Sequence, residues 1–292
     1  MISKKNILVT GANGQLGNEC KVLSAHYKDS NFVFTDVEEL SITDVAAIEE
    51  IFSKHNFDYC INAAAYTAVD NAEKDEDLSR TINATAVGYL ANACKKYNCR
   101  LIHISTDYVF DGENSIGYNE DDATAPINVY GATKLEGENL ALQLDPKSIV
   151  IRTSWVYSFY GKNFVKTMMK LMQEREEISV VNDQIGKPTY AADLAMAIFK
   201  IIFENENPTS GMYHFSNEGI ISWYDFAMAI KEIGGYTCKV NPIPSSAYPV
   251  PAKRPHFSIL NTSKIINTFS IQISEWRDSL QKCMQLLTSS SI

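Results

Sequence analysis

Residues 6–17 read NILVTGANGQLG, a short β-branched run followed directly by glycines at positions 11, 14 and 17. This order predicts a buried strand, a tight turn and the start of a helix. A side chain at Gly11 would obstruct the turn, one at Gly14 would hold a pyrophosphate off the backbone, and one at Gly17 would push the helix from the strand. Because a helix N-terminus offers unpaired amides and partial positive charge to an anion, the pattern predicts a dinucleotide-binding turn.

Short apolar runs alternate with longer segments of helical periodicity through the first half of the chain. We predict strands at 6–10, 31–36, 58–62, 100–105 and 148–152, and helices at 15–27, 44–55, 75–97 and 130–144. This alternation is typical of an α/β fold with a Rossmann-type, doubly wound parallel sheet.

The pattern becomes less regular after residue 152. We predict a strand at 178–181, helices at 193–203, 223–233 and 275–287, a strand-like run at 213–216 and a proline-containing loop at 241–244. We therefore expect a dinucleotide-binding domain of residues 1–152 plus about 177–206. A smaller, interleaved C-terminal substrate domain is expected to take about 153–176 plus 207–292.

The composition excludes several classes of protein. Of the 292 residues 45% are hydrophobic and 21% charged, and the formal net charge is −9, which argues against nucleic acid or an anionic membrane as a partner. The chain has neither a signal-peptide pattern nor a run of 18 apolar residues, so we expect a cytoplasmic protein. Its six cysteines include no CxxC pair and are expected to be reduced core residues.

A second pattern, YGATK at residues 130–134, places a phenol and an ammonium one helical turn apart. A free tyrosine titrates near pH 10, and Lys134 on the same helix face as Tyr130 would favour the phenolate and reach a ribose hydroxyl. The preceding predicted strand ends at Ser105-Thr106, where the Thr106 hydroxyl can polarise a carbonyl as charge develops on oxygen. We therefore predict that Thr106, Tyr130 and Lys134 are catalytic; an ordinary surface helix is the alternative for YxxxK.

Two further residues are candidates for ligand contacts. Asp36 ends the second predicted strand, where an acid can accept hydrogen bonds from the adenosine ribose hydroxyls and would repel a 2′-phosphate, so NADH should be tolerated. Arg254 lies between two prolines in Pro251-Ala-Lys-Arg-Pro255 and is the candidate cation for an anionic diphosphate. Each has a plainer alternative, as a strand-end acid or a surface-loop cation.

These motifs resemble the extended short-chain dehydrogenase/reductase family. Within that family the resemblance runs to the branch that reduces dTDP-4-dehydrorhamnose, and it extends over nearly the whole chain, through the runs at 62–70 (NAAAYTAVD), 105–112 (STDYVFDG), 128–134 (NVYGATK), 152–157 (RTSWVY), 183–189 (DQIGKPT), 211–216 (GMYHFS) and 254–255 (RP). The runs that begin at 105, 152 and 183 are the more specific ones.

The resemblance implies a function that the residues alone do not fix. It implies an oxidoreductase in which NADPH, or NADH, gives a hydride to C4 of dTDP-4-dehydro-β-L-rhamnose while Tyr130 protonates the keto oxygen. The product would be dTDP-L-rhamnose, a precursor of cell-surface polysaccharide. The resemblance implies that Tyr108 and Trp155 contact the substrate. It also implies cofactor contacts in addition to Gly11, Gly17 and Asp36, namely Gly14, Gln15, Leu16, Ala63, Ala64, Ala65, Tyr130 and Lys134.

The resemblance is weaker for metal binding. Some members hold Mg²⁺ through clustered glutamates at a dimer interface, and Glu19 matches one of these, but Ala191-Ala192 occupies the region where another is expected. We therefore assign no metal ligand, consider Mg²⁺ doubtful and interpret Glu19 as a solvated helix residue. A homodimer stays one of the alternatives.

Two rival functions remain open at this point. A nucleotide-sugar epimerase or dehydratase uses the same fold and YxxxK, although dehydratases usually follow the strand-end threonine with Asp-Glu, and here Asp107 is followed by Tyr108. A non-catalytic NADP-binding regulatory subunit also keeps the fold. Retention of Thr106, Tyr130 and Lys134 favours catalysis.

Overall fold

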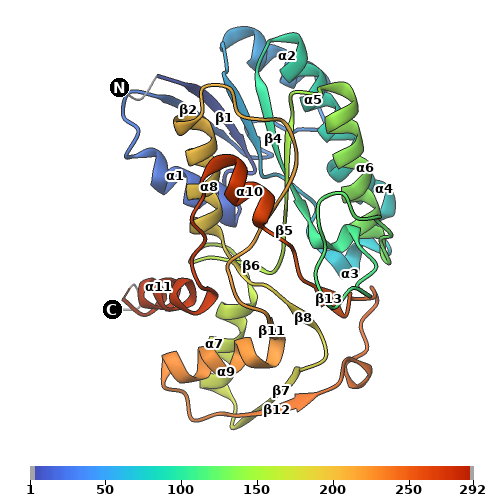
Figure 1. Cartoon of the computed structure of the whole chain (residues 1–292), viewed down its shortest axis with the longest axis vertical. Helices are drawn as coiled ribbons and strands as arrows, with labels where there is room; N and C mark the ends of the chain where they lie inside the picture. The colour runs from blue at the N-terminus through green and yellow to red at the C-terminus, as the bar shows by residue number, and fades with distance from the viewer. Residues whose placement is uncertain (1–3, 290–292) are drawn as a thin grey trace.

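The computed structural model describes residues 4–289, and its centre is a six-stranded sheet (Figure 1). The strand order is β10-β5-β4-β3-β1-β2 and every pairing is parallel. The strands are β1 (Asn6–Thr10), β2 (Asn31–Thr35), β3 (Tyr59–Asn62), β4 (Arg100–Thr106), β5 (Ile149–Thr153) and β10 (Gly211–Phe215). The predicted Rossmann-type fold is confirmed.

Helices cover both faces of this sheet, because its strands are apolar on both sides. One apolar cluster joins the sheet to α1 (Gln15–Ser24), α8 (Ala191–Glu204) and α10 (Ser263–Phe269). A second cluster joins the other face to α2 (Val45–Lys54), α5 (Ala86–Lys96) and α6 (Val129–Leu144). Between β3 and α5 lie α3 (Val69–Ala72), α4 (Glu76–Arg80) and the π-turn η1 (Thr81–Thr85), so the predicted helix at 75–97 is divided.

A smaller lobe lies beyond the C-terminal ends of the sheet strands, in the lower half of Figure 1. Its own apolar cluster is built around α7 (Phe164–Glu174), α9 (Trp223–Gly234) and α11 (Trp276–Ser289). Short strands complete it: β6 (Val156–Tyr157) with β9 (Thr189–Tyr190), β7 (Glu177–Val181) with β12 (Lys239–Ile243), and β8 (Ile185–Gly186) with β11 (Ile221–Ser222) and β13 (Phe257–Ser258).

The strand pairing departs from the predicted domain boundaries in two places. β7, predicted within the dinucleotide-binding domain, pairs with β12 in the smaller lobe, and β10, predicted within the substrate domain, pairs with β5 in the main sheet. The predicted loop at 241–244 is also wrong, since 239–243 form β12. Pro242 is tolerated there because β12 has only one neighbouring strand.

Candidate functional site

A cavity of about 1080 Å³ opens at the C-terminal ends of the sheet strands. Ligands bind at this edge in doubly wound sheets, where strand-to-helix turns converge. Most of the predicted site residues line it, namely Gly11, Gly14, Gln15, Leu16, Asp36, Ala63, Ala64, Ala65, Thr106, Tyr108, Tyr130, Lys134 and Trp155. Gly17 and Arg254 do not.

The glycine turn between β1 and α1 has two glycines that the protein itself requires. Gly11 has φ +66°, and a Cβ there would lie 2.6 Å from the backbone nitrogen of Ala64. A Cβ at Gly17 would collide with the carbonyl oxygen of Gly11. At Gly14 a Cβ would lie 3.2 Å from the same carbonyl oxygen, a tight contact but a milder one than at Gly11 or Gly17.

Gly14 is the N-cap residue of α1, and no side chain within residues 4–289 caps that helix start. The first amides of α1 therefore face the cavity without a side-chain partner, which fits a phosphate group. Asp36 lies beside the turn, where its carboxylate accepts hydrogen bonds from the backbone nitrogens of Asn13 and Val37, each at 2.8 Å. The turn and the acid are thus fixed to each other.

Helix α6 carries Tyr130 and Lys134, and its first turn is held against the loop after β4. The Asn128 side chain caps the helix by accepting from the backbone nitrogen of Gly131 at 2.8 Å. A Cβ at Gly131 would collide with the carbonyl oxygen of Tyr108, so this glycine permits close approach of the helix to the strand end. The sequence thereby fixes where Tyr130 enters the cavity.

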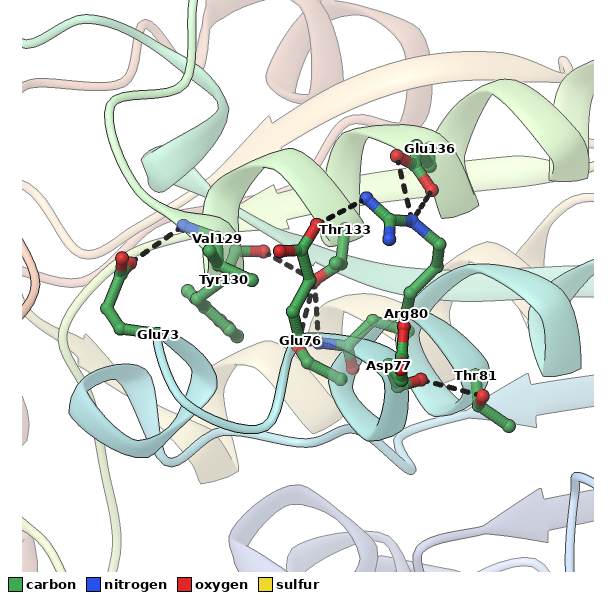
Figure 2. A network of polar contacts seen from close by, with 11 residues as sticks. Glu73, Glu76, Asp77, Arg80, Thr81, Val129, Tyr130, Thr133 and Glu136 are labelled. Carbon is green, nitrogen blue, oxygen red and sulfur yellow. Dashed lines mark hydrogen bonds and ion pairs between the residues drawn. The ribbon is translucent and has the colours of Figure 1, made fainter.

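Contacts with α3 and α4 hold the same helix from its other side (Figure 2). Glu73 accepts a hydrogen bond from the backbone nitrogen of Val129 at 2.9 Å. Arg80 binds Glu136 at 3.0 Å and Glu76 at 2.9 Å (Figure 2). Such exposed ion pairs are individually weak, and of the two only Arg80–Glu136 links α4 to α6, while Arg80–Glu76 lies within α4.

Thr106 ends β4, and its hydroxyl both donates and accepts a hydrogen bond. Its hydroxyl donates to Oδ1 of Asp107 at 3.0 Å and accepts from the backbone nitrogen of Tyr108 at 3.2 Å. Burial raises the pKa of Asp107 to about 6, and Oδ2 of this carboxyl has no hydrogen-bond partner among the described residues. Burial also raises the pKa of Tyr130 to about 12, while its hydrogen bond with Thr106 lowers that pKa and the Asp107 charge raises it.

Lys134 departs from the prediction that it favours the Tyr130 phenolate. Its side chain is only 2% exposed, and Nζ donates to the carbonyl oxygen of Ile104 at 2.6 Å and lies 3.5 Å from Nε2 of His103. Burial lowers the pKa of Lys134 to about 8, and the nearby Glu138 opposes that change. Burial of Tyr130 itself raises the pKa of its phenol, which keeps its proton at neutral pH.

Aromatic side chains form the wall towards the smaller lobe. Tyr108 packs edge-on against Tyr130, with ring centroids 5.6 Å apart. Trp155 stacks on Trp223 at 3.7 Å, and it has φ +48°, an uncommon backbone conformation for a large residue. A Cβ at Gly186 would lie 2.7 Å from the Trp155 ring, so this side chain is confined between two neighbours.

Arg254 lies outside the cavity lining and is already paired with an anion. Its guanidinium donates to Asp70 at 2.8 Å and to the carbonyl oxygen of Ala252 at 2.9 Å. Lys162 is a cation that does line the cavity, and the sequence reasoning missed it because it follows the aromatic run 155–160 with no motif of its own.

The interpretation of Glu19 as a solvated residue is wrong. It is 7% exposed, and Oε1 accepts from the Ser158 hydroxyl at 2.6 Å, which ties α1 to the smaller lobe. Burial raises its pKa, the Ser158 bond lowers it, and Asp193 raises it again. Within residues 4–289 no group of three or more His, Cys, Asp or Glu side chains is arranged to hold a metal ion, and no helix could cross a membrane.

The family model described as RmlD substrate binding domain matches residues 5–289. The chain belongs to this family. A dTDP-4-dehydrorhamnose reductase of Aggregatibacter actinomycetemcomitans is 43% identical over 94% of this chain and 97% of its own length, and that of Escherichia coli is 38% identical over 98% and 100%. A solved dTDP-4-dehydrorhamnose reductase of Bacillus anthracis, in complex with NADP, has a TM-score of 0.93 at 39% identity and covers 97% of this chain and 100% of its own. Membership in the RmlD family confirms the resemblance drawn from the sequence motifs.

Proposed function

We propose that this chain reduces the 4-keto group of dTDP-4-dehydro-β-L-rhamnose with NADPH or NADH and so produces dTDP-L-rhamnose. One observation carries the proposal: the glycine turn and the residues Thr106, Tyr130 and Lys134 line one cavity. The 43% identical relative named dTDP-4-dehydrorhamnose reductase supports the choice of substrate.

The residues present fit a dinucleotide. The uncapped start of α1 suits the pyrophosphate, and Gly14, which lines the cavity without a side chain, lets that group approach the backbone. We assign the pyrophosphate to Gly11, Gly14, Gln15, Leu16 and Gly17, the adenosine ribose to Asp36, and the nicotinamide ribose to Ala63, Ala64, Ala65, Tyr130 and Lys134. When bound, the nicotinamide supplies the hydride that the reduction requires.

Tyr130 is suited to give a proton rather than to take one. With its pKa raised to about 12, the phenol is protonated at neutral pH and can donate to the oxygen that becomes the 4-hydroxyl. The Thr106 hydroxyl has one proton, which it shares with Asp107 at 3.0 Å. It stabilises the developing alkoxide by turning that proton from Asp107 towards the substrate oxygen.

The substrate contacts are proposed in the same way. We assign the sugar to the wall formed by Tyr108 and Trp155. Arg254 is assigned to the diphosphate, which must then replace Asp70 as its anionic partner. A homodimer and a cytoplasmic location are part of the same proposal.

A spectrophotometric assay tests the proposal directly. The oxidation of NADPH, and separately of NADH, is followed with dTDP-4-dehydrorhamnose generated in situ. Absorbance should fall with at least one coenzyme and only when the sugar is present. A flat trace with both coenzymes would contradict the proposal and favour an epimerase, a dehydratase or a cofactor-binding subunit.

A further inference from the structure

Beneath α6, three neighbouring strands of the main sheet carry polar side chains at matched positions. Thr10 on β1 pairs in register with Asn62 on β3, which pairs with His103 on β4. All three are buried, at 1%, 0% and 0% exposure. Two residues earlier each strand has an apolar side chain on the same face, in the core shared with α2 and α5. Buried polar side chains need partners, and these three bind one another.

The donors around Asn62 fix the orientation of its amide group. The backbone nitrogen of Ala64 can only donate, and it lies 3.3 Å from Oδ1 of Asn62. The Thr10 hydroxyl donates to the same oxygen at 2.7 Å. The other end of the amide, Nδ2, therefore faces Nδ1 of His103 at 3.1 Å.

This orientation determines the tautomer of His103. Because the Asn62 amide nitrogen can only donate, Nδ1 of His103 accepts and carries no proton. The neutral ring then has its proton on Nε2. Burial, followed by the charge of Lys134, holds the pKa of His103 well below its usual value, so the ring stays neutral.

The Nε2–H of His103 is directed at the amine of Lys134, which lies 3.5 Å away. Lys134 donates one hydrogen to the carbonyl oxygen of Ile104 at 2.6 Å. An N–H facing an ammonium is unfavourable, whereas a neutral amine can accept it. The imidazole therefore disfavours a charged Lys134.

Other groups around Lys134 do not reverse this effect. The elements packed around it carry Tyr130, Glu136 and Glu138 on α6, Arg152 on β5, and Asp107 and Tyr108 on η2 (Asp107–Val109). Glu138 favours the charged amine, but Arg152 binds both its oxygens, at 2.9 and 2.7 Å. Tyr130 is protonated, and the charge of Asp107 raises the pKa of Tyr130 further.

We propose that His103 is a positioning residue whose tautomer, fixed by Asn62, holds the Lys134 amine in place and limits its charge. The proposal rests on the proposed function, since Lys134 bears on the reduction only if it binds the cofactor ribose as an ammonium. The consequence is an upper pH limit on activity, at which Lys134 loses its proton. Burial, which lowers the pKa of Lys134 to about 8, agrees with such a limit.

The substitution Asn62→Asp reverses the hydrogen bond that selects the tautomer. One carboxylate oxygen still accepts from Ala64 and Thr10, and the other accepts from His103, which must then carry its proton on Nδ1. Nε2 becomes an acceptor for the Lys134 ammonium. The alkaline limb of kcat/KM for NADPH should move up by about 1 pH unit, the scale expected when a buried amine gains a favourable partner.

Nitrogen-15 NMR of the histidine rings tests the tautomer without any assay of activity. The His103 signals, assigned by their loss in His103→Gln, should show a proton on Nε2 in the native protein and on Nδ1 in Asn62→Asp. A native ring protonated on Nδ1, or on both nitrogens at neutral pH, would overturn the proposal. This test stands whether or not the chain reduces a nucleotide sugar, and the native spectrum decides it even if Asn62→Asp does not fold.

A double substitution separates the tautomer from the added carboxylate charge. In the His103→Gln background, Asn62→Asp should move the alkaline limb clearly less than it does with His103 present. An equal shift in both backgrounds, or no shift in the single variant, would overturn the proposal. His55→Gln is the control, because His55 stacks on Phe57 after the end of α2 and does not line the cavity, and it should leave the limb in place.

Discussion

Replacing Tyr130 by phenylalanine should abolish most of the reduction without disturbing the cavity. The substitution removes only the hydroxyl, and the ring keeps its edge-on contact with Tyr108 at 5.6 Å. Among the described residues no neighbour replaces it as the acid, because the Thr106 hydroxyl can stabilise the substrate oxygen by a hydrogen bond but does not give up its proton, and Lys134 donates to the carbonyl oxygen of Ile104. We therefore expect the full effect of losing a positioned acid, a fall in kcat of about 100-fold or more, which corresponds to about 2.7 kcal/mol of transition-state stabilisation.

The assay is the sugar-dependent oxidation of NADPH, measured together with the dissociation constant of NADPH. The Tyr130→Phe variant should bind NADPH about as tightly as the native protein, since the ring and Lys134 remain. Tyr213→Phe is a suitable control, because Tyr213 lies on β10 outside the cavity and its hydroxyl donates to the carbonyl oxygen of Thr209. A Tyr130→Phe variant with kcat within a few-fold of native would refute the role of this hydroxyl as the proton donor.

Four other substitutions follow from the same structure. Gly17→Ala should lower the unfolding temperature, since a Cβ there collides with the Gly11 carbonyl, at a cost of about 1–3 kcal/mol. Gly14→Ala makes a milder contact with the same oxygen, so it should lower the unfolding temperature less but weaken NADPH binding in a titration, and equal losses of stability in the two variants would contradict this division. Arg254→Ala should raise KM for the sugar nucleotide more than it lowers kcat, and the opposite pattern in steady-state kinetics would remove Arg254 from substrate binding. Burial raises the pKa of Asp107 to about 6 in the folded protein, above its value of about 4 in the unfolded chain. As pH rises from about 4 to 6 the unfolded chain loses this proton first, so the free energy of unfolding falls progressively over that range. Asp107→Asn should therefore gain up to about 3 kcal/mol of unfolding free energy above pH 6 and nothing below pH 4, and a gain independent of pH in urea titrations would count against the raised pKa.

The main sheet could be predicted because its strands are coded locally. Each run of β-branched residues lies between turn signals, and the predicted strand at 6–10 and helix at 130–144 agree with β1 and α6 to within one residue. Prediction from local sequence was wrong at β12, where the proline indicated a loop. It also missed α7, which follows an aromatic run. Neither the partner strand of β12 nor the core beneath α7 is visible in sequence.

The positions of the site residues could be predicted, but their interactions could not. The motifs placed Tyr130, Lys134 and Thr106 at the correct strand and helix ends, because the fold brings those ends together. Lys134 was expected to act on Tyr130, yet it binds Ile104 on β4. The hydrogen-bond partner of Lys134 lies on a neighbouring strand that is far away in sequence. Asp70, the ion-pair partner of Arg254, is also far away in sequence.

The most direct test of the whole account is to follow the hydride itself. The enzyme is supplied with NADPH deuterated at both C4 positions of the nicotinamide, together with dTDP-4-dehydro-β-L-rhamnose, and the product is examined by mass spectrometry and proton NMR. The account predicts dTDP-L-rhamnose with deuterium at C4 of the sugar. A product without deuterium at that carbon, or no product while the dinucleotide is bound, would contradict it.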